Sequence, residues 1–285
     1  MVPMMSELYL YHPVFRQTFA VFAFLLGMMV GSFLNVCIYR IPAGKSIVYP
    51  PSGCPLCGHQ IRWYENIPVL SWLALRGRCS GCKAPISIQY PLVELLTGFL
   101  FLMSYIEWNL SIDLLFILIY LALLIVIAGI DIKSQIVPHV LTIPGMVCGL
   151  IYAYLAPERS LLYAVSGLFI GGGMLLMVIV AFYLVTKKIG MGGGDVMILA
   201  MIGSYIGPTK LAPVLFIASV GGILFFFAMR LFSGKRRIAG SITADDIKGS
   251  EHDLDRVIYF GPFLAIGGAI MLFVSDDTII RFLTF

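Results

Sequence analysis

The sequence predicts an all-α polytopic membrane protein of about eight transmembrane helices, with a small polar insertion between the first helix and the second. Of its 285 residues, 60% are hydrophobic and 12% are charged, which is about half the charged fraction of a soluble domain. Apolar runs recur along the chain, and roughly 20 apolar residues cross a bilayer core. The polar insertion holds four of the six cysteines.

The apolar runs predict where the helices lie. The first run continues to Ile38 and ends at Arg40, and its only earlier basic residue is Arg16, so we expect a retained helix and not a removable signal. The sixth run is short and bordered by glycines. The predicted spans are 18–38, 91–107, 112–130, 137–155, 161–186, 195–206, 211–232 and 258–275.

The runs and the polar stretches divide the chain into three expected parts. Residues 1–39 hold the first transmembrane helix, residues 40–90 form the insertion, and residues 91–285 form the main helical bundle. The bundle is interrupted by a charged loop at 233–257, which we expect to be solvated.

The basic residues predict the orientation. When the ends of the eight runs are assigned alternately to two sides, 15 of the 19 Lys and Arg residues fall on the side of the insertion. Cytoplasmic loops carry such an excess. The insertion and the loop at 233–257 are therefore expected in the cytoplasm, with both termini outside. The net charge of +4 reflects this topology and does not indicate a nucleic-acid partner.

The cysteines of the insertion have the spacing of a structural zinc site. Cys54 and Cys57 form one C-x-x-C pair, and Cys79 and Cys82 form another after 21 intervening residues. Four thiolates complete a tetrahedron around zinc, and structural disulfides are rare in the cytoplasm. A redox pair and metal-free thiols remain alternatives, and His59 is a possible substitute for one ligand.

Two aspartates border the membrane runs. Asp131 follows the run 112–130, and Asp195 begins the run 195–206, which places both at the cytoplasmic edge. Acids beside membrane helices are rare and are a functional hypothesis by default. If the two helices pack together, one carboxylate can activate water while its protonated partner polarises a peptide carbonyl. The alternative is that both aspartates only cap helices.

Three glycines, Gly192, Gly193 and Gly194, directly precede Asp195. Glycine permits unusual dihedrals and the close approach of another backbone, so we expect a flexible segment where a substrate strand lies. The run is no dinucleotide fingerprint, because position 195 is not Gly and no βαβ unit precedes it.

Other residues in the helices are expected to serve structure. The spacings Gly27-x-x-x-Gly31 and Gly167-x-x-x-Gly171 allow helices to approach closely. Glu94 is a third acid next to an apolar run, and we expect it to form an ion pair with a cytoplasmic base such as Arg40.

Several motifs follow one another along nearly the whole chain. They are Gly31-Ser-Phe-Leu-Asn-Val-Cys-Ile-Tyr-Arg-Ile-Pro42, the two C-x-x-C pairs, Glu65-Asn-Ile-Pro-Val-Leu-Ser-Trp72, Leu75-Arg-Gly-Arg-Cys79, Tyr90-Pro-Leu-Val-Glu94-Leu-Leu-Thr-Gly98, Val137-Pro-His-Val-Leu-Thr142, the Gly-x-Gly-Asp run at 192–195, and Gly261-Pro-Phe-Leu264. In this order they resemble the motifs of bacterial type IV prepilin peptidases.

The resemblance implies an aspartic protease of the bacterial inner membrane that also methylates its product. Such enzymes cut a short basic leader from type IV prepilins and type II secretion pseudopilins, then transfer a methyl group from S-adenosylmethionine to the new N-terminus. By resemblance, Asp131 and Asp195 are catalytic and the four cysteines bind zinc. Gly77 and Arg78 match positions associated with methyl transfer.

Two positions depart from the family pattern. Met197 stands where the family often has Lys, and His139 stands where it often has Asp or Asn. Neither change removes a carboxylate of the expected pair, so they bear on substrate preference and pH optimum.

Three alternatives remain at this stage. The first is a leader peptidase that does not methylate. The second is a transporter that uses the aspartates as a proton relay, although no repeated halves of the kind common in transporters are visible. The third is a membrane-anchored zinc module that binds a partner through residues 40–90.

Overall fold

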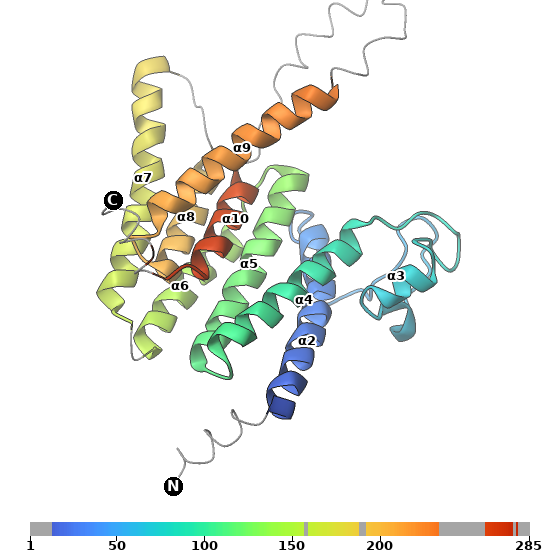
Figure 1. Cartoon of the computed structure of the whole chain (residues 1–285). Helices are drawn as coiled ribbons and strands as arrows, with labels where there is room; N and C mark the ends of the chain where they lie inside the picture. The colour runs from blue at the N-terminus through green and yellow to red at the C-terminus, as the bar shows by residue number, and fades with distance from the viewer. Residues whose placement is uncertain (1–12, 157–158, 188–191, 234–259, 276–277, 279–285) are drawn as a thin grey trace, which may run out of the picture. The chain divides into compact units, whose positions relative to one another are not determined.

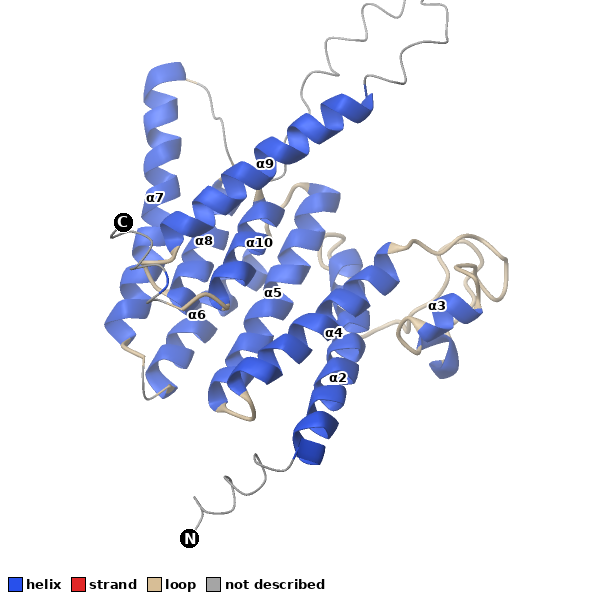
Figure 2. Ribbon diagram, in the orientation of Figure 1, coloured by secondary structure: helices blue, strands red, loops and turns tan. Residues whose placement is uncertain are grey.

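The computed structural model describes residues 13–156, 159–187, 192–233, 260–275 and 278, and all regular elements within these ranges are helices (Figures 1 and 2). This confirms the predicted fold class. The loop at 233–257 lies almost wholly outside the described residues. The elements are α2 (Pro13–Arg40), η1 (Trp63–Asn66), α3 (Leu70–Ala74), α4 (Gln89–Trp108), α5 (Ile112–Ser134), α6 (His139–Leu155), α7 (Leu161–Thr186), α8 (Gly193–Ile206), α9 (Leu211–Ser233) and α10 (Gly261–Leu272).

Each predicted apolar run corresponds to a helix, but the helices differ in length. Five of them, namely α2, α4, α5, α7 and α9, are long and apolar enough to cross a membrane. The other three, α6, α8 and α10, have 17, 14 and 12 residues. At 1.5 Å per residue, α10 is about 18 Å long, whereas a bilayer core is about 30 Å thick. The described residues thus establish five candidate spans and three shorter apolar helices.

The chain packs as two compact units, Met1–Ala164 and Val165–Phe285. In the first unit, α2 lies against α4 with their backbones in contact. A Cβ added at Gly27 would lie 2.7 Å from the carbonyl oxygen of Thr97, and one at Gly31 would lie 2.8 Å from the Cα of Glu94. The expected packing role of this glycine pair is confirmed, because any larger side chain would force the helices apart.

Helix α5 packs beside α2 in the same unit. Gly129 of α5 leaves room for the side chain of Ile38, which a Cβ at Gly129 would meet at 2.5 Å. Ile38, Val126 and Ile130 belong to one buried cluster on these two helices. Helix α5 begins at the N-cap Ser111, whose side chain accepts a hydrogen bond from the N–H of Leu114.

In the second unit, α8 is buried along its last nine residues, from Ile198 to Ile206. Gly167 and Gly203 bring the backbones of α7 and α8 into contact, and a Cβ at Gly171 would lie 2.5 Å from the carbonyl oxygen of Leu199. The packing role expected for Gly167-x-x-x-Gly171 is therefore confirmed. Helix α10 packs against both α8 and α9.

Candidate functional site

The four cysteines of the insertion come together as a metal-binding group. Their sulfur atoms all lie within 4.8 Å of one another, with 3.7 Å between Cys54 and Cys82 and 3.9 Å between Cys57 and Cys79. Sulfurs placed about 2.3 Å from a central zinc would be about 3.8 Å apart, so the spacing fits such an ion. None of the six cysteines forms a disulfide, so all four sulfurs of the group are free to bind a metal.

The two C-x-x-C turns are copies of one another. The N–H of Cys54 donates to His59 and that of Cys79 donates to Ala84, while Gly58 and Lys83 donate back to the first cysteine of each pair. Gly58 and Lys83 both have positive φ, at 70° and 62°. Residues 53 and 60 form an antiparallel bridge, as do residues 78 and 85. The equivalence is structural only, since the two segments share little sequence beyond the cysteines.

Backbone N–H groups in these turns favour thiolates. The N–H groups of Cys57 and Leu56 lower the pKa of Cys54 to about 6, and those of Cys82 and Gly81 lower the pKa of Cys79. For Cys57, the N–H of His59 lowers the pKa, but desolvation and the neighbouring cysteines together outweigh this effect. The pKa of Cys57 is therefore raised, to about 11. A cation at the centre would relieve this crowding of negative charge.

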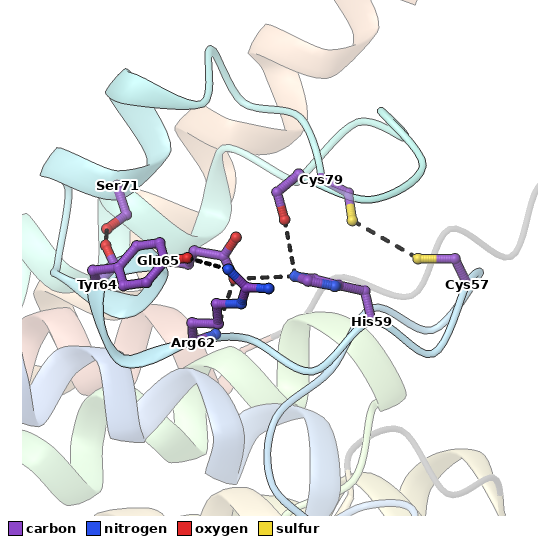
Figure 3. Close-up of polar contacts among 8 residues, drawn as sticks. Cys57, His59, Arg62, Tyr64, Glu65, Ser71 and Cys79 are labelled. Carbon is purple, nitrogen blue, oxygen red and sulfur yellow. Dashed lines mark hydrogen bonds and ion pairs between the residues drawn. The ribbon is translucent and has the colours of Figure 1, made fainter.

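A polar cluster next to the cysteines joins the two turns. Nε2 of His59, on the first turn, lies 3.1 Å from Oε2 of Glu65 (Figure 3). The same nitrogen lies 2.9 Å from Oγ of Ser80, on the second turn. The backbone N–H of Arg62 and the side chains of Ser80 and His59 form hydrogen bonds that lower the pKa of Glu65 to about 2. His59 thus lies outside the four-cysteine group and positions it, so all four ligands of the expected site are cysteines.

Gly77 and Arg78 enter the second cysteine turn. Gly77 has a φ of 65°, and a Cβ there would lie 2.9 Å from Cζ2 of Trp72. Its carbonyl accepts the N–H of Ile86, whereas Arg78 is exposed. Gly77 is therefore required by the local backbone, and the proposed link of both residues to methyl transfer stays a prediction.

Replacing Gly77 with Ala is expected to loosen the second cysteine turn. The positive φ alone costs about 1–2 kcal/mol for a residue with a Cβ, and the indole of Trp72 must also move. Gly44→Ala is the matched control, because Gly44 has a φ of 63° but no atom within 4 Å of an added Cβ. Metal retention during dialysis against a chelator measures the difference. Equal loss from both variants contradicts a special role of the Trp72 contact.

Glu94 connects a membrane helix to the insertion. It is 6% exposed, and its Oε2 accepts a hydrogen bond of 2.7 Å from the N–H of Val69, the residue before α3. Val69 has a φ of 62°, which is an outlier for a β-branched residue. The expected ion pair with Arg40 is wrong: Arg40 instead donates to the carbonyls of Ser46 and Pro50.

Replacing Glu94 with Ala is expected to free α3 from the bundle. The N–H of Val69 is only partly buried, so losing its acceptor costs about 1 kcal/mol, the lower end of the range for buried donors, and proteolysis within 41–88 should become about five times faster. Glu94→Gln keeps an acceptor oxygen and should stay near the rate of the unchanged protein. Glu107→Ala, an exposed acid at the other end of α4, is the control. Rapid cleavage of the Gln variant with slow cleavage of the Ala variant contradicts this anchor.

Asp131 is located in the last turn of α5. It is 7% exposed, and its carbonyl accepts the N–H of Gln135, which ends the helix in a left-handed conformation. A buried acid in the C-terminal turn opposes the helix dipole and is costly to desolvate. Asp131 is therefore a candidate functional group, and its catalytic role stays a prediction.

Asp195 is located in the first turn of α8, as its third residue. The N-cap is Gly192, so the idea that Asp195 itself caps the helix is wrong. Gly193 and Gly194 open the helix, and none of the three glycines has a positive φ. Space around Gly193 is open, with no atom within 4 Å of an added Cβ. The helix dipole favours the carboxylate here.

The two aspartates belong to different units, Asp131 to the first and Asp195 to the second. Each is described within its own unit, and their pairing stays a prediction.

The sequence motifs did not predict two features of the insertion. One is the cluster of His59, Glu65 and Ser80, and the other is the contact of Val69 with Glu94. Glu65 accepts the N–H of Arg62 at the start of η1, but Arg62 is not a usual first residue of a capping box, so the sequence offered no standard signal for Glu65.

Comparisons with known proteins agree with this arrangement. The model of the bacterial peptidase A24 N-terminal domain matches residues 25–108, and that of the type IV leader peptidase family matches residues 118–227. A protein of Myxococcus xanthus (strain DK1622) is 41% identical over 82% of this chain and 70% of its own length. One from Stutzerimonas stutzeri is 35% identical over 94% of both chains, and one from Pseudomonas aeruginosa is 37% identical over 96% of both.

These three relatives carry the name prepilin leader peptidase/N-methyltransferase. No solved structure matches the chain at comparable significance. Fold and site define a polytopic helical membrane protein with a four-cysteine group in the insertion after its first described helix. More specifically, the chain belongs to the type IV leader peptidase family.

Proposed function

We propose that this protein removes the leader peptide from type IV prepilins and pseudopilins and then methylates the new N-terminus. The observation that carries the proposal is the 35% identity to a prepilin leader peptidase/N-methyltransferase over 94% of both chains. The likeness includes the cysteine-containing insertion as well as the bundle, because the two family models match residues 25–108 and 118–227. The transporter alternative is not favoured.

Asp131 and Asp195 are proposed to cleave the peptide bond together. One ionised carboxylate accepts a proton from water, and the resulting hydroxide equivalent attacks the scissile carbonyl carbon. The other carboxyl donates a hydrogen bond to the carbonyl oxygen as negative charge develops there. The leaving amine takes up a proton as the C–N bond breaks. Burial of Asp131 and the helix-start position of Asp195 give the two acids the different environments that such roles need.

Zinc is proposed as the resident metal of the four-cysteine group. The sulfur spacing, the N–H groups directed at Cys54 and Cys79 and the absence of disulfides support this assignment. Four thiolates would leave no open position for water on the metal, so bound zinc would stabilise the insertion and take no part in hydrolysis.

Methyl transfer from S-adenosylmethionine is the second proposed activity. The amine lone pair of the new N-terminus attacks the methyl carbon, the bond from that carbon to the sulfonium sulfur breaks, and the amine loses a proton. The names of the relatives support this activity. Gly77 and Arg78 are proposed to contribute to this reaction. Because Gly77 also supports the fold of the insertion, a test of Gly77 must measure both methylation and the folding of the insertion.

The protein is proposed to lie in the bacterial inner membrane, with the insertion in the cytoplasm and both termini on the outer side. The distribution of Lys and Arg, 15 against 4, supports this orientation. A cytoplasmic insertion also puts the cysteines where thiols stay reduced. The proposed partners are prepilin and pseudopilin substrates and the surrounding lipid.

One assay tests the proposed function. The purified protein in lipid vesicles receives a synthetic precursor peptide and S-adenosylmethionine, and mass spectrometry follows loss of the leader and gain of a methyl group. We expect both changes, with cleavage first. Cleavage without methylation would leave a leader peptidase alone, and an intact precursor under conditions that support a relative would overturn the proposal.

A further inference from the structure

A groove lies between α2 and the start of the insertion, away from both aspartates in the sequence. Its volume is about 320 Å³, within the range of pockets that hold small molecules. One wall is the side of α2 that carries Met29, Ser32, Phe33, Val36 and Arg40, and the other wall is the segment 47–52 together with Asn66. All of these residues belong to the first unit.

The wall on α2 has the dimensions of one membrane leaflet. Met29, Phe33, Val36 and Arg40 are spaced by four, three and four residues, so they share one face of the helix. From the first to the last is eleven residues, or about 16 Å of helix, which is about half the thickness of a bilayer core. Met29 and Phe33 are 64% and 49% exposed on a candidate membrane span, so we expect this face to meet lipid chains.

A cation, Arg40, closes the groove at the last residue of α2. The guanidinium of Arg40 donates to the carbonyls of Ser46 and Pro50, at 2.9 Å and 2.7 Å, and these oxygens carry no net charge. Among the residues that the structure describes, no carboxylate forms an ion pair with Arg40. Its other N–H donors are of the kind that binds phosphate oxygens.

The surroundings of Arg40 have the composition of a membrane interface. Tyr39 and Tyr49 are 51% and 75% exposed, and the ammonium of Lys45 lies 5.8 Å from the centre of the Tyr39 ring. Tyrosine is enriched at the level of the head groups, and basic residues there attract anionic lipids. Met29, Phe33 and Val36 on one side and Arg40 at the end of the helix thus follow one another in the order in which a phospholipid presents its chain and its head, with Ser32 as the polar residue between them.

We propose that this groove binds an anionic phospholipid, with the phosphate at Arg40 and an acyl chain along Met29, Phe33 and Val36. The bound lipid holds the segment 47–52 against α2 and so fixes the root of the insertion. The sulfonium of a methyl donor fits this groove poorly, because the one charged residue in its wall is a cation. A basic leader peptide is disfavoured for the same reason.

Native mass spectrometry of the full chain tests the site. The protein is released from vesicles of equal phosphatidylglycerol and phosphatidylcholine content, and retained lipids are counted. We expect about tenfold preferential retention of phosphatidylglycerol. Val36→Trp fills the groove and should abolish this preference, whereas Val21→Trp, on an exposed part of α2 outside the groove, should keep it. Arg40→Gln should also abolish it.

Each result bears on the proposal. No preference in the unchanged protein overturns it, whatever the variants do. A preference that survives both Val36→Trp and Arg40→Gln places the lipid elsewhere and also overturns it. Displacement of the retained lipid by added S-adenosylmethionine would assign the groove to the methyl donor instead. Because these readouts measure binding alone, they are independent of whether the chain cleaves prepilin.

Discussion

Replacing either Asp131 or Asp195 with asparagine is expected to slow leader removal by about 10³-fold or more, while the protein stays folded in the membrane. Asparagine keeps the size of the side chain but can neither accept the proton of water nor donate as an acid. General acid–base groups contribute about 10²–10⁴-fold each. Cleavage of a synthetic precursor, followed by mass spectrometry over a time course, measures the loss.

The double variant tests whether the two carboxyls act as a unit. Groups that act together are strongly non-additive, so Asp131→Asn with Asp195→Asn should be no slower than the slower single variant. Glu107→Gln is the matched control, because it removes an exposed acid from the end of a membrane helix and should leave cleavage unchanged. Normal processing by either single variant, or multiplied losses in the double variant, contradicts the pairing.

Replacing Cys54 with serine is expected to remove the metal from the purified protein and to open the insertion to proteases. Structural zinc contributes about 10–16 kcal/mol in small domains, and a segment as short as 41–88 has little apolar core to replace it. The buried residues of this segment are Ser71, Gly77 and Cys79. Metal content by elemental analysis and limited proteolysis in membranes measure the two effects.

Cys148→Ser is the control for that change. Cys148 is half-buried in α6 and takes no part in the four-cysteine group, so the variant should keep its metal. If Cys54→Ser retains a full complement of zinc, the metal is held elsewhere and the assignment of the group is wrong. If zinc is lost but the protein still cleaves, the metal supports the insertion and not hydrolysis, as a closed site implies.

The sequence predicts the helices of this protein well because membrane helices leave a strong compositional signal. Every backbone polar group in lipid must be satisfied within the helix, so long apolar runs can form little else. The eight runs match eight helices. The helix ends are less well predicted: α5 continues to Ser134 and α8 begins at Gly193, because local capping at Gln135 and Gly192 decides them, and this leaves Asp131 and Asp195 inside their helices.

The hydrogen-bond partners of charged side chains were harder to predict from the sequence. Glu94 was expected to form an ion pair with Arg40, since opposite charges near one membrane edge suggest it. In the structure the carboxyl of Glu94 meets the N–H of Val69, and the guanidinium of Arg40 meets two carbonyls. These three partners are backbone groups, which no sequence pattern distinguishes from any other backbone group.

The sequence alone determined the fold class and singled out the four cysteines that the structure groups together, because these follow from residue type and from spacing along one chain. It also singled out the two aspartates, whose catalytic pairing stays a prediction. Tertiary structure alone decided that the two cysteine turns are equivalent, that His59 joins them through Glu65 and Ser80, and that a groove forms beside Arg40. These features depend on how segments far apart in the chain meet. Such meetings depend on packing and on backbone hydrogen bonds, which leave little trace in the order of residues.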